Sequence, residues 1–250
     1  MTIRAQVFVV DRDALFDGVW PQGYHRLHDT NSFLAEARRR GRFVDREEAE
    51  SNPSWKQLIP YCMLRCGDWS PAGQPADRGV FLVQRTKKGG ETRLHNSWSV
   101  GLGGHIEPID VKTAPTAKSD ISEANEARAF FAAALGRELC EELVLPQANQ
   151  VPAPRLLGLI NDDSTEVGAV HAGLAYSIDF PFPLQTAREM VGIREVSKLQ
   201  GGFRHLVEFA NLWQTQSQFE SWSRFLIQAE ISGAIGDSPS AGPHSAESGA

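Results

Sequence analysis

Apolar and polar positions recur along the chain with two different periods, and these periods separate strands from helices. Over residues 169–178, Val170, Ala172, Leu174 and Tyr176 alternate with small or polar side chains, which predicts a strand. Apolar runs bounded by turn-forming residues predict further strands over residues 5–10, 61–66, 79–86, 97–102, 155–160 and 189–196.

Helical periodicity is strongest in the segment that ends near residue 143. Leu135, Leu139 and Leu143 recur every four residues and form one apolar stripe. The stretch 120–123 resembles a capping box and Pro146 marks a stop, so we expect a helix from about residue 120 to 143. Shorter helices are expected over residues 32–40 and within 207–225, where the aromatic spacing suits packing onto a sheet.

The long helix also carries three carboxylates beside its apolar stripe. Glu138, Glu141 and Glu142 share an arc of roughly 100°, because each residue advances an α-helix by that angle. Like charges crowded in this way repel, and a bound divalent cation would reverse that cost. Mg²⁺ takes oxygen ligands and usually binds through a few carboxylates and substrate phosphates, and Mn²⁺ is an alternative. A solvated acidic helix face is the other interpretation of the pattern.

Together with two glycines far upstream, this helix resembles the Nudix box, G-x5-E-x7-R-E-U-x-E-E-x-G-U, where U is a large aliphatic residue. The strand expected over 97–102 leads into Gly103 and Gly104, and Gly104 matches the opening glycine. The second half of the box is matched by Arg137, Glu138, Leu139, Glu141, Glu142 and Leu145. The resemblance covers roughly residues 79–178. It is greatest to a branch of predicted Nudix phosphoesterases, through the stretches 93–96 and 161–163.

Three departures from the box affect geometry more than chemistry. Arg137 lies 33 residues after Gly104, whereas the box places it 14 residues on, so the chain has an insertion of 19 residues. Counting forward from Gly104 puts the first glutamate position at Asp110, and counting back from Arg137 puts it at Ala129. The late glycine is replaced by Val144. The Arg-Glu and Glu-Glu pairs, which the family needs for metal chemistry, are intact.

The resemblance implies a Nudix-like α/β/α sandwich with a mixed central sheet. It also implies a Mg²⁺-dependent hydrolase that cleaves a diphosphate bond in a small nucleotide-like or other diphosphate-containing metabolite. The metal would be held by Glu138, Glu141 and Glu142, with the Gly104 carbonyl as a further ligand. Arg137 would orient a glutamate by an ion pair rather than touch the substrate. Glu138, Glu142 and Arg137 are therefore the catalytic candidates within the box.

A general base is expected outside the box, because its position varies within this family. Glu166 is the first candidate, since its turn follows the first strand after the helix, and Asp162 and Asp163 compete with it. All three are equally well explained as turn residues. His105 and His171 could donate hydrogen bonds to phosphate, although a lone histidine in a sheet is more often structural.

Two other function classes stay open. A Nudix-fold ligand-binding or regulatory module without turnover is favoured by the displaced first glutamate, while the intact Arg-Glu and Glu-Glu pairs weigh against it. An isomerase of the isopentenyl diphosphate type shares the fold, but such enzymes need a catalytic cysteine before the helix, and the stretch 97–107 contains none. Phosphate or nucleotide release from a panel of substrates with Mg²⁺ would discriminate among the three classes.

Composition limits the kinds of partner and the cellular location to be expected for this protein. The chain has 250 residues, of which 41% are hydrophobic and 22% charged, and we expect one domain over 1–234 with a disordered tail over 235–250. A formal charge of −6 argues against a broad nucleic-acid-binding surface. The sequence has no apolar run long enough to span a membrane and no separate signal segment at Met1, which predicts a cytoplasmic protein without membrane partners. A homodimer stays open.

Cysteines and loops complete the expectations. Cys62, Cys66 and Cys140 are expected to be reduced and mostly buried, and they are too few for a cysteine-ligated zinc site. Residues 111–119 lack periodicity and are expected to be an exposed loop that accounts for much of the insertion. Another loop is expected earlier in the chain, over about residues 85–93. It carries Arg85, Lys87, Lys88 and Arg93, which could contact substrate phosphates.

Overall fold

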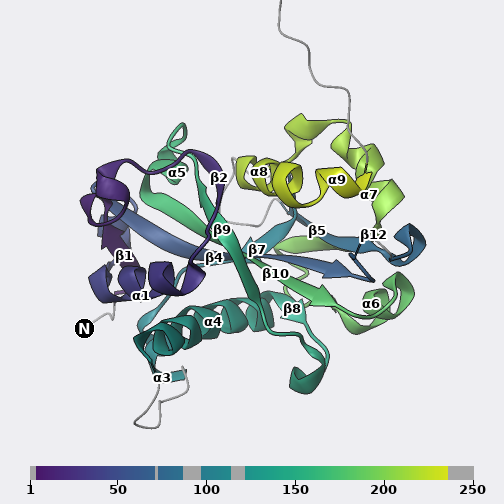
Figure 1. Ribbon diagram of the computed structural model, residues 1–250, viewed down its shortest axis with the longest axis horizontal. Helices are drawn as coiled ribbons and strands as arrows, with labels where there is room; N and C mark the ends of the chain where they lie inside the picture. Colours follow the sequence, from purple (N-terminus) through teal and green to yellow (C-terminus); the bar gives the residue numbers. More distant parts are fainter. Residues whose placement is uncertain (1–3, 71–72, 87–96, 114–121, 236–250) are drawn as a thin grey trace, which may run out of the picture.

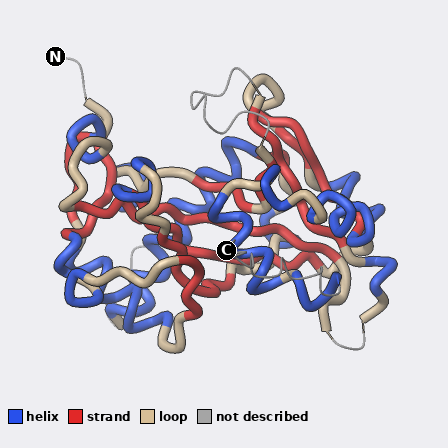
Figure 2. Tube along the Cα trace, turned by 90° about the horizontal axis from the view of Figure 1, so that it is seen from above, coloured by secondary structure: helices blue, strands red, loops and turns tan. Residues whose placement is uncertain are grey.

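A ten-stranded mixed sheet forms the centre of the protein. The computed structural model describes residues 4–70, 73–86, 97–113 and 122–235. Strands extend along the long axis of the molecule (Figure 2), and helices lie on both sides of the sheet (Figure 1). The predicted α/β/α sandwich with a mixed central sheet is therefore confirmed.

The elements have the following bounds. The main sheet contains β1 (Gln6–Asp11), β2 (Gly23–Arg26), β3 (Arg42–Asp45), β4 (Trp55–Cys66), β5 (Gly79–Arg85), β6 (Trp98–Ser99), β7 (Gly101–Gly103), β9 (Arg155–Asn161), β10 (His171–Phe180) and β12 (Leu199–His205). A separate pair consists of β8 (Leu143–Val144) and β11 (Gly192–Ile193). The α-helices are α1 (Thr30–Arg40), α2 (Arg46–Ala49), α3 (Pro108–Thr113), α4 (Glu123–Glu142), α5 (Glu166–Val170), α6 (Leu184–Met190), α7 (Leu206–Trp213), α8 (Ser221–Glu230) and α9 (Ser232–Ile235). Short 3₁₀ turns lie at Arg12–Ala14, Phe16–Gly18, Pro75–Asp77, Ala148–Gln150 and Gln216–Gln218.

Strand β4 is the central strand of the sheet. It pairs in parallel with β10 on one side and antiparallel with β1, β5 and β7 on the other, within the order β12-β5-β4-β10-β9-β2. Successive side chains point to opposite faces, so Leu58 and Leu64 belong to one core cluster and Tyr61 and Met63 to the other. A strand buried on both faces reads as a continuous apolar run, and the expected strand over 61–66 captures only its second half.

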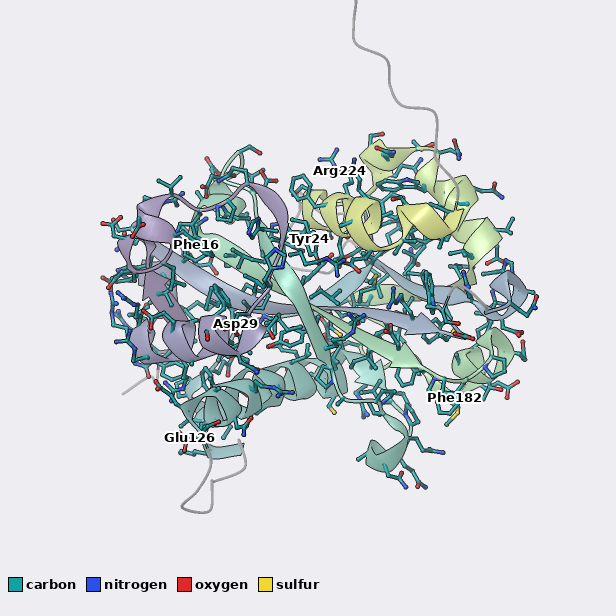
Figure 3. All side chains as sticks on the ribbon, in the orientation of Figure 1. Phe16, Tyr24, Asp29, Glu126, Phe182 and Arg224 are labelled. Carbon is teal, nitrogen blue, oxygen red and sulfur yellow. The ribbon has the colours of Figure 1, made fainter. Side chains whose placement is uncertain are left out.

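The long helix α4 covers one face of the sheet together with α1 (Figure 1). The predicted apolar stripe is buried, with Leu135, Leu139 and Leu143 each at most 2% exposed. On the opposite face α7 and α8 supply the second core cluster. Figure 3 shows Tyr24 of β2 close to α8, where its hydroxyl donates a hydrogen bond to Glu230 at 2.7 Å. Both faces of the sheet are thus covered by amphipathic helices.

The insertion begins with a helix, where a loop was predicted. Residues 111–113 belong to α3, although Val111 and Lys112 are exposed as expected. Helix formation starts early because Pro108 suits a first helical turn and Asp110 accepts a hydrogen bond from the backbone N–H of Glu107 at 2.8 Å. The rest of the predicted loop lies outside the described residues, and so do Lys87, Lys88, Arg93 and the tail beyond residue 235.

Other differences from the predictions have local causes. The strand expected over 189–196 was wrong, because α6 extends to Met190 and only Gly192–Ile193 forms a strand. The edge strand β12 was missed because Gly201 and Gly202 interrupt its apolar pattern. Two of the three cysteines are buried as predicted, while Cys140 is exposed on α4. None of the helices in the described parts of the chain combines the length and apolar character that a membrane span needs.

Two adjacent positions of α4 should respond oppositely to alanine. Leu135→Ala should lower the free energy of unfolding by about 2–5 kcal/mol, because it empties a buried site in the core. Gly136→Ala should raise it by about 0.5–1 kcal/mol, because nothing lies within 4 Å of the added carbon and alanine favours helix. Urea denaturation of both variants measures the two shifts. A Gly136→Ala protein that is less stable would contradict the exposed, regular helix described here.

Candidate active site

Arg137 ties the long helix to the loop that follows β7. Its Nε donates to Asp110 Oδ1 at 2.8 Å and its Nη2 donates to the carbonyl oxygen of His105 at 2.7 Å. Its Nη1 donates to Glu138 Oε1 at 2.8 Å and to Glu141 Oε1 at 3.3 Å. A planar guanidinium with five donors suits several acceptors at once. This geometry is the one expected of a residue that orients a glutamate.

Asp110 resolves the ambiguity about the first acidic position of the box. Its side chain is fully buried and binds the guanidinium of Arg137 with both oxygens. Ala129, the competing position, lies within α4. This contact favours the forward count from Gly104, and the 19 extra residues then lie between Asp110 and Arg137.

Gly104 and Glu138 are in close contact. A carbon atom added at Gly104 would lie 2.3–2.5 Å from the carboxylate atoms of Glu138, so only glycine allows this approach. Burial raises the pKa of Glu138, and the neighbouring Arg137 only partly opposes that effect. A divalent cation would favour the charged carboxylate. The atoms nearby that could bind a metal are carboxylate and carbonyl oxygens, which fits a hard ion such as Mg²⁺. Of the other two box glutamates, Glu141 is exposed and Glu142 is half-buried.

A second group of possible ligands lies near the box and includes His105, which follows Gly104 on the loop after β7. Glu50, His105 and His171 each place one ligand atom within 4.8 Å of the others. The Nε2 atoms of the two histidines are 3.3 Å apart, and Glu50 Oε1 lies 3.6 Å from His105 Nε2. Burial lowers the pKa of His105 to about 3, and the nearby charges of Arg46, His171 and Arg137 add to this effect. His105 is therefore a neutral imidazole at physiological pH.

The sheet register brings the two histidines together. Strand β7 is antiparallel to β4 and pairs Gly103 with Tyr61, two residues before His105. Strand β10 is parallel to β4 and pairs His171 with Gln57. The histidines therefore reach the same end of β4 from its two sides. Neither spacing nor periodicity in the sequence connects them, because the pairing is long-range.

Lys56 anchors the segment that leads from β9 to β10. Its buried ammonium donates to Asn161 Oδ1 at 2.8 Å and to Asp163 Oδ1 at 2.6 Å. It also lies within hydrogen-bonding distance of the carbonyl oxygens of Gly168, at 2.6 Å, and His171, at 3.2 Å. Burial is the main cause that lowers the pKa of Lys56 and the charge of Arg12 adds to it, while Asp163 opposes both. The four acceptors around Nζ suit an ammonium with three N–H groups.

The three carboxylates considered as a general base have different surroundings. Burial would raise the pKa of Asp163, but hydrogen bonds from Lys56 and Gln22 outweigh it and lower the pKa to about 2. Asp162 is buried, and there too burial is outweighed, by hydrogen bonds from Ser164 and Ser221 that lower its pKa. Glu166 is exposed in the first turn of α5. The expected polar turn thus continues into a short helix capped by the side chain of Thr165.

Glu50 and Lys56 are the residues near the site that sequence reasoning missed. Glu50 belongs to a stretch that reads as a solvated acidic surface, and nothing in its spacing connects it with a histidine 55 residues later. Lys56 could have been recognised from the sequence, because a lysine next to a buried apolar run needs an acceptor or a carboxylate to pair with. Identifying that partner requires the pairing of β4 with β10.

Comparisons with known proteins place related chains beside this one. No family model matches the chain. The chain is 30% identical over 228 residues to Protein YmaB of Bacillus subtilis strain 168, in a match that covers 88% of this chain and 95% of YmaB. It is also similar to the crystal structure of Tm1382, a proposed Nudix hydrolase, with a TM-score of 0.63 and 25% identity. That match covers 90% of this chain and 97% of Tm1382, so it extends well beyond the box.

Removing the ammonium of Lys56 should destabilise the protein. Lys56→Met removes the donor to the carbonyl oxygens of Gly168 and His171 and leaves Asp163 paired with Arg12 and Gln22, so urea denaturation should show a loss of about 1–3 kcal/mol. Asp163 has a lowered pKa in the folded protein, so its contribution is present above pH 3.8 and is lost as the pH falls towards 2. This acid-side loss should be smaller in Lys56→Met. An unchanged free energy of unfolding would show that the lysine is not a buried ion-pair partner.

Proposed function

Because the chain belongs to the Nudix family, whose fold it shares with Tm1382, we propose that it is a Mg²⁺-dependent hydrolase of a small diphosphate-containing metabolite. The bond cleaved would be a phosphoanhydride, in a nucleotide-like or other diphosphate. The observation that carries the proposal is the network of Arg137. It joins Asp110, Glu138 and the loop after Gly104 in spite of the long insertion.

Glu138, Glu141 and Glu142, with the carbonyl of Gly104, would hold the metal. Bound there, Mg²⁺ would neutralise phosphate charge, polarise a phosphoryl oxygen and help to ionise the attacking water. Arg137 donates to Glu138 Oε1, which holds the carboxylate next to Gly104. The helix thus offers a preorganised set of oxygen ligands on one face.

Glu166 remains our first candidate for the general base. A base works best when its pKa lies near the working pH, and Asp163 is far below that range and engaged with Lys56. Asp162 is engaged with Ser164. Glu166 lies in the exposed first turn of α5, and this helix leads directly into His171 at the start of β10.

The alternative of a binding module without turnover depended on a displaced first acidic residue. The ion pair of Asp110 with Arg137 favours the hydrolase over that alternative. The test is a panel of nucleoside diphosphates, dinucleoside polyphosphates, sugar nucleotides and non-nucleotide diphosphates, assayed for phosphate or nucleotide release with Mg²⁺ or Mn²⁺. A folded, metal-binding protein that hydrolyses no member of the panel would contradict the proposal.

Metal binding should depend on the box carboxylates. Mg²⁺ or Mn²⁺ should raise the melting temperature of the wild-type protein in proportion to the logarithm of the metal concentration. The double variant Glu138→Gln/Glu142→Gln keeps the shape of both side chains, so it should stay folded by circular dichroism and lose the shift. If the double variant gains the same stability from metal, the box is not the Mg²⁺ site.

Replacing the base should separate catalysis from metal binding. A positioned general base contributes about 10²–10⁴-fold to rate. With an active substrate in hand, Glu166→Gln should lower kcat by about that factor and leave the metal-dependent rise in melting temperature intact. Near-normal turnover in this variant would remove Glu166 from consideration and transfer the role to Asp162, Asp163 or a box glutamate.

A further inference from the structure

We propose that Glu50, His105 and His171 form a second metal site, selective for an ion of the Zn²⁺ type and separate from the carboxylates of the box. The three ligand atoms lie within 4.8 Å of one another. They come from three separate parts of the chain: the end of α2, the loop after β7 and the first residue of β10. Whether they bind metal does not depend on which reaction the box supports.

The spacing of the imidazoles fits one shared ion. Zn²⁺ binds histidine nitrogen at about 2.0–2.1 Å, so two such ligands in tetrahedral geometry are about 3.3–3.4 Å apart. The Nε2 atoms of His105 and His171 are 3.3 Å apart. Glu50 Oε1 lies 3.6 Å from His105 Nε2, and Oε2 lies 3.9 Å from His171 Nε2. The exposed Glu50 carboxylate thus has one oxygen near each imidazole nitrogen, where it could supply a third ligand.

Hydrogen bonding prepares His171 for this role. Its Nδ1 lies 2.7 Å from the carbonyl oxygen of Val167. A carbonyl only accepts, so Nδ1 carries the proton and Nε2 presents its lone pair to the cluster. Metal-binding histidines usually donate their second N–H to a carbonyl or carboxylate in this way.

Two cations, the buried Lys56 and the half-buried Arg137, hold the backbone of the ligands in place. Lys56 Nζ lies 3.2 Å from the carbonyl oxygen of His171. Arg137 donates to the carbonyl oxygen of His105 at 2.7 Å. Arg137 also binds Glu138, so the imidazole site and the box share a positioning residue while using different ligands. Imidazole nitrogen suits Zn²⁺, Ni²⁺ and Co²⁺, whereas the all-oxygen set of the box suits Mg²⁺.

The competing explanation is a hydrogen-bonded histidine pair. His105 Nε2 would then donate to His171 Nε2, and Glu50 would interact only with Arg46, whose Nε is 3.4 Å from Oε1. The pair between Glu50 and Arg46 is solvent-exposed and contributes little. It would not prevent Glu50 from turning to an ion. The two explanations therefore differ in whether the full-length protein binds zinc through imidazole.

The experiment uses the full-length protein with Cys140→Ser, which removes the exposed thiol as an adventitious zinc ligand. Zinc affinity is measured by competition with a chromophoric chelator. His171→Asn keeps a donor near Nδ1 and lacks Nε2, and His105→Asn is its counterpart. Each should weaken zinc binding by more than about 100-fold, since loss of an outer hydrogen-bond partner alone costs about 10–100-fold. Glu50→Gln should weaken zinc binding as well.

Matched controls separate this site from others. His25→Asn changes an exposed histidine on β2 and should leave zinc affinity unchanged. Glu138→Gln/Glu142→Gln should lose the Mg²⁺ effect but keep zinc affinity. Zinc affinity that falls in this double variant and persists in His105→Asn and His171→Asn would overturn the proposal.

X-ray absorption at the zinc edge supplies a result that needs no variant. The zinc-loaded protein should show two imidazole nitrogens at about 2.0–2.1 Å. A shell of oxygen ligands alone, or a protein that takes up no zinc, would establish the hydrogen-bonded pair instead. If a histidine variant fails to fold by circular dichroism, this spectrum decides the question.

Discussion

The site depends on the ion pair and hydrogen bonds that the guanidinium of Arg137 makes. Asp110 is fully buried, and a buried carboxylate without a cation is strongly destabilising, by about 3–5 kcal/mol when its partner is removed. The same guanidinium fixes Glu138 and the carbonyl of His105. One side chain therefore joins the loop after β7, the helix α3 and the helix α4. The insertion can be long because the contacts of Arg137 set the distance between the two halves of the box. The length of the connecting chain does not set it.

Lys56 has the corresponding role on the other side of β4. It connects the interior of the sheet with Asp163 and with the carbonyl oxygens of Gly168 within α5 and His171 just after it. Both side chains donate to backbone carbonyl oxygens outside regular strand pairing, Arg137 to that of His105 and Lys56 to those of Gly168 and His171. The loops around the site are consequently attached to the most buried part of the fold.

The sequence predicts much of this arrangement where the signal is local. The stripe of Leu135 and Leu139, the carboxylates beside it and the fold class all follow from spacing within one helix or from resemblance to the box. The first acidic position was ambiguous because the insertion makes the two counts disagree, and only the contact of Asp110 with Arg137 decides between them. The partners of Glu50 and Lys56 could not be predicted for a different reason. They lie far along the chain, and the sequence does not specify the strand register that brings them close.

The parallel pairing of β4 with β10 has a consequence for the order of folding. It joins Gln57 to His171, more than a hundred residues later, so closing this loop has a large entropic cost before any contact compensates for it. Local helices such as α4 can form long before that closure. The box carboxylates can therefore be assembled on their helix early, whereas the imidazole cluster exists only after the central sheet has closed. A nascent chain would therefore bring the three box carboxylates together before the two imidazoles meet.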